Sequence, residues 1–281
     1  MPVMDDAWQH WLTDNVARGC SLESMVESML RAGFDRVTAD AAVQNSVGTG
    51  RQASLIKTES TEYRYDLCPV ASGNLIRAYD IEVEVLMRFQ RPQVVVFGGV
   101  LSPDECGEII ERSRHRLKRS TIVDPHSGKE DAIDSRSSEG IWFQRGEDAL
   151  IERLDRRISA MMNWPVENGE GLQVLHYATG GEYRPHFDYF PPDQAGSASH
   201  IARGGQRVAT LIVYLNDVPN GGETIFPEAG ISVVGRQGGA VYFRYQNGSR
   251  QLDPLTLHGG APVLGGEKWI MTKWMRERAY I

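Results

Sequence analysis

Cysteine is scarce in this sequence, and its scarcity excludes two kinds of architecture. The 281 residues include only three cysteines, Cys20, Cys68 and Cys106, which are far apart and form no C-x-x-C pair. An odd number of isolated cysteines argues against a disulfide framework and against a thiolate zinc site. We therefore expect free thiols that pack as small apolar side chains.

A basic excess and a long apolar run are also missing. Lysine and arginine number 30 against 37 aspartates and glutamates, which gives a formal net charge of −7. A protein that binds a phosphate backbone needs clustered positive charge instead. No apolar stretch reaches the roughly 18 residues of a membrane helix, and the acidic start MPVMDDAWQHW is unlike a secretory signal. We therefore expect a cytoplasmic protein with no nucleic-acid or membrane partner.

What is present fits one large folded domain with a smaller one attached. Hydrophobic residues make up 41% of the chain and charged residues 24%, so the chain can bury a core and is not disordered by composition. Residues 1–46 carry apolar side chains at helical spacing and are predicted to form an N-terminal helical module. Residues 47–75 have no sustained period and are predicted to be a linker. The main domain is predicted to span residues 76–281.

The N-terminal segment contains a recognisable helix–turn–helix string. The residues SMVESMLRAGFDRVTADAAV put Gly33 and Phe34 between two helical stretches. This string resembles three-helix modules of the ubiquitin-associated type, in which a Gly-Phe turn joins two helices. Two interpretations stay open: a packing appendage, or a site where a protein partner docks.

The main domain begins with mixed elements and then becomes rich in predicted strands. Ile81–Met87 alternates, Val94–Phe97 is a short buried-strand run, and helices are predicted after Ser102 and over Ala149–Asn163. Short apolar runs separated by Gly and Pro turns follow: LQVLHY, YRPHFDYF, VATLIVYL, ISVV, AVYFRY and KWIMTKWM. This pattern predicts an antiparallel sandwich or barrel with helices covering one sheet, which is an α+β architecture.

Two histidines and an aspartate suggest a metal site in this domain. In a strand, residues i and i+2 lie on one face about 6.6 Å apart, so His186 and Asp188 could bind one metal ion while Phe187 points away. His258 offers a second imidazole downstream. Two neutral imidazoles and one carboxylate form the facial triad of non-haem iron(II) oxygenases, which leaves positions open for co-substrate and dioxygen. Lys268 would be a costly buried charge in the same barrel unless it met an anion, and a dicarboxylate co-substrate supplies one.

Several longer segments resemble a known family. They are LQVLHYATGGEYRPHFDYF, GGQRVATLIVYLNDVPNGGETIFPEAG and LHGGAPVLGGEKWIMTKWMRE, preceded by FGGVLSPDECGEII and DSRSSEGIWF. All are similar to the prolyl 4-hydroxylase branch of the 2-oxoglutarate/iron(II) dioxygenases, and the resemblance spans residues 91–278. It implies a double-stranded β-helix, or jelly-roll, core flanked by helices.

The resemblance also implies roles for individual residues. The implied metal ligands are His186, Asp188 and His258. Lys268 matches the residue that pairs with the distal carboxylate of 2-oxoglutarate, assisted by the hydroxyls of Tyr177 and Thr224. A zinc hydrolase with the same three ligands is a chemical alternative, but it leaves Lys268 and Thr224 without a role.

Three further positions match residues that face the substrate in that family: Tyr183, Arg207 and Trp269. The simpler interpretation of Tyr183 is a packing aromatic, and that of Arg207 is a solvated arginine at a strand start. Residues 124–145 are a candidate loop that closes over the site.

The implied activity is hydroxylation of peptidyl proline at C4, coupled to oxidative decarboxylation of 2-oxoglutarate to succinate and CO2. It requires Fe(II), 2-oxoglutarate and O2, with ascorbate as reductant, and its partner is a proline-containing protein or peptide. One alternative is an Fe(II)/2-oxoglutarate hydroxylase of a free amino acid or another side chain, which a closed pocket would favour over an open groove. The other is a catalytically inactive binding or regulatory protein, which an intact ligand set argues against.

Overall fold

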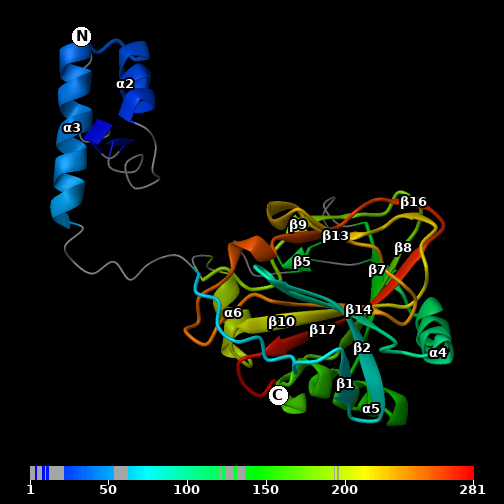
Figure 1. The fold of residues 1–281 in the computed structure, drawn as a ribbon. Coiled ribbons are helices and arrows are strands. Elements are labelled where there is room, and N and C mark those ends of the chain that lie inside the picture. Colours follow the sequence, from blue (N-terminus) through cyan, green and yellow to red (C-terminus); the bar gives the residue numbers. More distant parts are fainter. Residues whose placement is uncertain are drawn as a thin grey trace. The chain divides into compact units, whose positions relative to one another are not determined.

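The chain folds into two compact units, Met1–Glu62 and Tyr63–Ile281. The computed structural model describes residues 4, 8–9, 11–12, 22–53, 63–119, 122–123, 130–131, 137–192, 194 and 196–281. Within these ranges, no helix has both the length and the apolar character needed to cross a bilayer. Figure 1 draws the helices of the first unit in blue and the elements of the second unit in cyan to red.

Two helices make up most of the described part of the first unit. Helix α2 spans Leu22–Arg31 and helix α3 spans Arg36–Ala53. Asp35 caps the N-terminus of α3: its carboxylate accepts hydrogen bonds from the backbone N–H and the hydroxyl of Thr38 at 2.9 and 2.7 Å. A small apolar core holds this unit together: Leu12, Met25, Val26, Met29, Phe34, Ala39 and Val43.

The described residues of the second unit form two larger antiparallel sheets and two two-stranded ones. The larger has nine strands in the order β1-β2-β3-β14-β10-β17-β8-β7-β4, and the smaller has four in the order β13-β12-β15-β9. The strands of the large sheet are β1 (Leu75–Ala78), β2 (Ile81–Gln90), β3 (Gln93–Gly98), β4 (Lys118–Arg119), β7 (Glu139–Phe143), β8 (Leu172–Tyr177), β10 (Arg207–Tyr214), β14 (Ala240–Arg244) and β17 (Lys268–Arg276). Those of the small sheet are β9 (Tyr183–His186), β12 (Thr224–Phe226), β13 (Ile231–Val233) and β15 (His258–Gly260).

Shorter elements complete this unit. They are the strand pairs β5 (Ile122–Val123) with β6 (Glu130–Asp131) and β11 (Asn220–Gly221) with β16 (Val263–Gly265), the helices α4 (Pro103–Arg114), α5 (Ala149–Met162) and α6 (Ser197–Ala202), and the 3-10 turns η1 (Val166–Asn168), η2 (Pro227–Ala229) and η3 (Pro254–Thr256). The result confirms the predicted α+β jelly-roll core flanked by helices (Figure 1).

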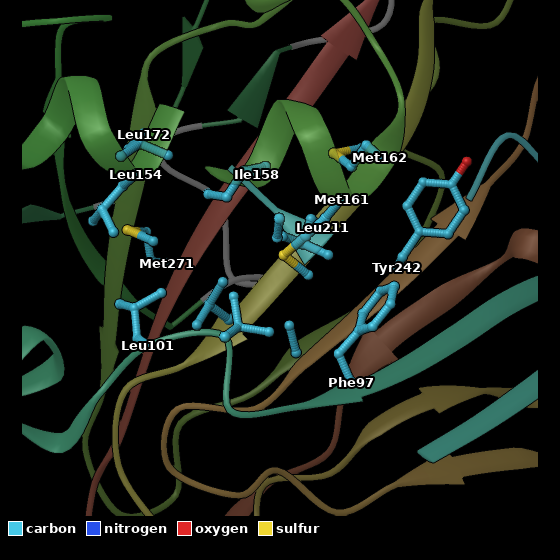
Figure 2. Packing of buried hydrophobic residues seen from close by; sticks show 14 of the residues in the cluster. Phe97, Leu101, Leu154, Ile158, Met161, Met162, Leu172, Leu211, Tyr242 and Met271 are labelled. Atoms are coloured by element: carbon cyan, nitrogen blue, oxygen red, sulfur yellow. The ribbon is translucent and has the colours of Figure 1, made fainter. Parts of the chain in front are cut away.

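Helices α4 and α5 pack on one face of the large sheet. Each begins at a side-chain cap: Ser102 forms a capping box with Glu105, and the Asp148 carboxylate accepts from the first N–H groups of α5. Figure 2 shows Leu154 and Ile158 of α5 in the same buried cluster as residues of the sheet beneath them. This face of the sheet therefore carries the main apolar core.

A second apolar cluster fills the space between the two sheets. It joins residues of the large sheet to residues of the small one: Val94, Leu175, Tyr177, Ile212, Tyr214, Phe226, Ile231, Val233, Val241, Phe243, Tyr245, Val263 and Ile270. The rings of Phe226 and Phe243 meet edge to face, with centroids 5.2 Å apart. The small sheet is thereby fixed above the centre of the large one.

The side chains of strand β17 alternate between the space that faces the small sheet and the main core under the helices, since successive side chains of a strand point to opposite faces. Lys268, Ile270, Thr272 and Trp274 face the cavity beside the small sheet. Trp269, Met271 and Met275 belong to the core beneath the helices. All nine residues of the strand are buried, so each face must satisfy its own polar groups.

The boundary between the units differs from the expected linker over residues 47–75. Helix α3 continues to Ala53, and the chain from Tyr63 onward belongs to the second unit. Asp66 binds the buried guanidinium of Arg244 through two hydrogen bonds of 2.6 and 3.1 Å, and Val70 lies in the main core. Composition alone could not show that the chain from Tyr63 belongs to the second unit, because the partner of Asp66 is far away in sequence.

Candidate active site

His186, Asp188 and His258 converge at one point of the small sheet. His186 ends β9 and His258 begins β15, and the two are directly opposite each other across these antiparallel strands. Their Nε2 atoms lie 3.7 and 3.5 Å from the two carboxylate oxygens of Asp188. One ligand atom from each residue lies within 4.8 Å of the other two. Asp188 itself lies in a bend just after β9 rather than in the strand that the sequence predicted.

Both imidazoles are oriented by the backbone. Nδ1 of His186 lies 2.9 Å from the carbonyl oxygen of Arg184, and Nδ1 of His258 lies 3.0 Å from that of Thr256. Each Nδ1–H donates to its carbonyl, which leaves the Nε2 lone pair free for a metal. Burial lowers the pKa of His258 to about 4 despite the adjacent carboxylate. This imidazole is therefore neutral at pH 7, the form that binds metals.

Asp188 supplies the negative charge of the cluster. Burial alone would raise the pKa of this carboxyl group, but the neighbouring His258 and His186 outweigh that effect and lower it well below its usual range. The ionised carboxylate also accepts a hydrogen bond of 2.6 Å from the hydroxyl of Thr210. Two neutral imidazoles and one carboxylate are the donor set of a facial Fe(II) site, so these residues fit such a metal.

Lys268 lies in the same cavity of about 420 Å³. Its side chain is only 4% exposed, and burial lowers its pKa to about 8, although the negative charge of Glu223 partly opposes this shift. Among the described residues no carboxylate oxygen comes within the 4 Å of its ammonium that an ion pair needs. Tyr177, its cross-strand neighbour, presents a ring centroid 5.7 Å from Nζ. Thr224 also lines the cavity, and its hydroxyl accepts from Tyr214 at 2.8 Å. An unpaired buried cation is therefore aimed at a space that an anion can enter.

Two of the three predicted substrate residues line this cavity. The ring of Tyr183 stacks on His186, with centroids 3.6 Å apart. Arg207 lies with its guanidinium 4.1 Å from the ring centroid of Trp274. It is bound by Glu170 through hydrogen bonds of 2.7 and 2.9 Å. Because its charge is already paired, Arg207 is held in place rather than solvated.

Trp269 does not line the cavity, and this expectation was wrong. It follows Lys268 in β17, so alternation turns its side chain to the opposite face of the sheet. There it is buried in the main core and packs on His176, with ring centroids 4.4 Å apart. Proximity in sequence to a cavity residue was the wrong criterion in a strand.

Sequence reasoning missed two residues that line the cavity, Trp142 and Trp274, and two that bind residues of the site, Glu170 and Thr210. Alternation along β17 from Lys268 would have found Trp274, which meets Trp142 with centroids 5.5 Å apart. Glu170 and Thr210 carry no local signal, because their partners Arg207 and Asp188 come from other parts of the chain. Half of the predicted closing loop over residues 124–145, namely 124–129 and 132–136, lies outside the described residues.

The jelly-roll fold and this site define the class of the protein as a 2-oxoglutarate/Fe(II) oxygenase. Residues 172–276 match the 2OG-Fe(II) oxygenase superfamily. The chain is 39% identical over 208 residues to "Probable prolyl 4-hydroxylase 10" of Arabidopsis thaliana, covering 67% of this chain and 70% of that protein. It is 37% identical over 256 residues to "Prolyl 4-hydroxylase 1" of the same plant, covering 84% and 88%.

A solved structure points to the same branch. The viral collagen prolyl hydroxylase of Paramecium Bursaria Chlorella virus-1, in a 2OG complex, superposes with a TM-score of 0.52 at 30% sequence identity, covering 65% of this chain and 95% of that one. The chain therefore belongs to the prolyl 4-hydroxylase family of the 2-oxoglutarate/Fe(II) oxygenases.

Proposed function

We propose that this protein hydroxylates peptidyl proline at C4 and couples the reaction to oxidative decarboxylation of 2-oxoglutarate to succinate and CO2. The observation that carries the proposal is the pairing of two features in one cavity: the His186, Asp188 and His258 cluster, and the unpaired ammonium of Lys268. A metal site alone suits many reactions, and a buried cation alone suits many anions. Together they suit a keto acid with a second carboxylate.

Lys268 binds the distal carboxylate of 2-oxoglutarate. A buried charge without a partner costs several kcal/mol in effective terms, and the incoming carboxylate offsets this cost. The hydroxyls of Tyr177 and Thr224 are suited to donate to the same carboxylate, because both residues line the cavity beside Lys268. Since Thr224 Oγ1 already accepts from Tyr214, its own proton is free for the co-substrate.

His186, Asp188 and His258 would hold Fe(II) through two Nε2 atoms and a carboxylate oxygen. When bound, Fe(II) supplies the redox chemistry that links oxidation of the keto acid to oxidation of a substrate C–H bond. The protein positions the ligands, because backbone carbonyls fix both imidazole rings. The apolar walls of the cavity also restrict the entry of water. Ascorbate is proposed as the reductant that keeps the iron ferrous between turnovers.

The substrate side of the cavity suits an extended peptide. Tyr183, Trp142 and Trp274 offer aromatic surface for a pyrrolidine ring. Trp142 is 41% exposed, so this aromatic wall continues from the buried site to solvent, where a peptide chain can leave the cavity. Arg207, held by Glu170, fixes the position of Trp274 through stacking.

The test is incubation of the full chain with Fe(II), 2-oxoglutarate, ascorbate, O2 and a proline-rich peptide. We expect one added oxygen on proline by mass spectrometry, 4-hydroxyproline on amino-acid analysis, and succinate in equal amount. Asp188→Ala abolishes both products, whereas Asp104→Ala, an exposed position at the start of α4, keeps them. Oxidation of a free amino acid with no change in any peptide would instead favour the small-molecule alternative.

A further inference from the structure

Beneath the metal cluster, Thr210 of β10 contacts the carboxylate of Asp188. Its side chain is fully buried, and its Oγ1 lies 2.6 Å from Oδ2 of Asp188. The hydroxyl of Tyr245, also fully buried, lies 3.3 Å from the same Oγ1. Neither residue has a role in the proposed function so far.

The direction of these hydrogen bonds follows from counting protons. An ionised carboxylate only accepts, so Thr210 must use its single hydroxyl proton on Asp188. Thr210 Oγ1 then accepts from the hydroxyl of Tyr245. A one-way chain of donors therefore runs from Tyr245 through Thr210 to Oδ2 of Asp188, inside a region where each bond is strengthened by the exclusion of water.

We propose that Thr210 is a positioning residue that reserves Oδ2 of Asp188 for this hydrogen bond and leaves Oδ1 as the one oxygen available to the metal. The inference rests on the proposed iron site. A carboxylate that used both oxygens would occupy space that the keto acid or O2 needs, because the facial triad must leave positions open for them. Thr210 thus protects the open side of the site without touching any substrate.

A second contact restrains the same residue from its backbone. Nη1 of Arg207 lies 3.3 Å from the carbonyl oxygen of Asp188. The main chain is therefore held by Arg207 and the carboxylate by Thr210, which leaves the side chain little freedom to turn. Hydrogen-bonding partners of metal-binding carboxylates commonly tune metal affinity in this way.

The experiment measures metal binding rather than turnover. Mn(II) is titrated calorimetrically into the metal-free full chain, and 2-oxoglutarate is then titrated into the Mn(II) form. Thr210→Val should weaken Mn(II) binding by about 10- to 100-fold and should also weaken 2-oxoglutarate binding to the Mn(II) form. Thr210→Ser keeps the hydroxyl and should restore both affinities to within about threefold of the unsubstituted protein. The visible absorption of bound Co(II), which depends on coordination number, should change in Thr210→Val and return in Thr210→Ser.

Ser113→Ala is the control, because it removes an equally buried hydroxyl that donates to the backbone carbonyl of Ile109 in α4 and does not line the cavity. It should leave Mn(II) affinity unchanged. Equal loss in Ser113→Ala and Thr210→Val would overturn the inference, as would unchanged Mn(II) affinity and Co(II) absorption in Thr210→Val. If Thr210→Val fails to fold, Tyr245→Phe decides: weaker Mn(II) binding at unchanged apo stability supports the donor chain, and unchanged binding refutes it.

The outcome is separable from that of the proposed function. If the unsubstituted protein binds Mn(II) and hydroxylates the peptide while Thr210→Val behaves identically, only the role of Thr210 is lost. If the unsubstituted protein binds neither Mn(II) nor 2-oxoglutarate, the proposed function is lost as well.

Discussion

Strand β17 carries two buried lysines that face opposite sides of the large sheet. Lys273 points toward α5, where its ammonium donates to Asp155 at 2.6 Å and to the backbone carbonyl of Glu170. Lys268 points into the cavity of the metal cluster and has no carboxylate within ion-pair distance in the described part of the chain. Their exposures are alike at 1% and 4%, and burial lowers the pKa of both.

The two lysines differ in whether a carboxylate pairs with them. This difference distinguishes a charge that stabilises the fold from a charge that is available to bind a ligand. Other buried cations on the helix side are also paired: Arg157 binds Asp80 and Glu105, and Arg244 binds Asp66. A charge that the fold neutralises internally contributes to the fold. A charge left unpaired in a cavity raises the free energy of the folded protein and favours binding of an anion that neutralises it.

Removing the paired lysine should have the largest effect on stability. Lys273→Met leaves the Asp155 carboxylate buried without its cation, which should lower the free energy of unfolding by about 3–5 kcal/mol. Urea denaturation monitored by circular dichroism measures this. At urea concentrations below the unfolding transition, the affinity of this variant for 2-oxoglutarate should be unchanged. A loss of affinity without a loss of stability would reverse the roles assigned to the two lysines.

The unpaired lysine should show the opposite pattern. Lys268→Met should weaken 2-oxoglutarate binding to the Mn(II) form by about 2–5 kcal/mol, because the distal carboxylate then enters the cavity without its cation. The free energy of unfolding of the apo protein should stay the same or rise, since an unpaired buried charge is removed. Calorimetric titration and urea denaturation of the same variant test both statements. Affinity within threefold of the unsubstituted protein would contradict them.

A milder test extends the comparison to the segment that precedes β1. Asp66→Asn keeps the shape of the side chain but removes the charge that Arg244 binds, and it should cost about 1–2 kcal/mol of stability because Asp66 is itself partly exposed. Asp104→Asn, an exposed aspartate in the first turn of α4, serves as the control. Peptide and 2-oxoglutarate affinities should not change. Equal stability of the two variants would mean that residues 63–74 contribute little to the second unit.

The smallest expected effect is a pH dependence of co-substrate binding. The pKa of Lys268 is about 8 in the empty cavity, and a bound carboxylate raises it. Affinity for 2-oxoglutarate should therefore be constant below pH 8 and fall as the pH rises, by roughly tenfold between pH 7 and pH 9. The weak residual binding of Lys268→Met should not vary over this window. A flat profile for the unsubstituted protein would show that this ammonium does not bind the carboxylate.

The sequence was most informative where chemistry depends on residue type and short spacing. His186 and Asp188 lie two positions apart, and the short strands between Gly and Pro turns predicted a β-rich domain with helices on one side. His258 and Lys268 were added from the donor set of a facial triad and from the cost of burying an unpaired lysine, and the family resemblance implied the same roles. In the structure His186, Asp188 and His258 form one cluster and Lys268 lines the same cavity, although Asp188 lies beyond the end of its strand.

The sequence was least informative where a residue's role depends on a distant partner or on strand register. Trp269 was misassigned because a neighbour of a cavity residue in a strand faces the other way. The partners Glu170 of Arg207 and Thr210 of Asp188 are brought together only by strand pairing, which no local pattern encodes. The segment from Tyr63 to Ala71 was taken as part of a linker for the same reason.

The most direct test of the account is a crystal structure of the protein with Mn(II) and 2-oxoglutarate. It should contain the metal between the Nε2 atoms of His186 and His258 and the carboxylate of Asp188. The distal carboxylate of 2-oxoglutarate should lie within ion-pair distance of Lys268 Nζ, and Lys273 should remain on Asp155. A co-substrate carboxylate bound elsewhere, with Lys268 still unpaired, would contradict the claim that this lysine is the binding charge of the site.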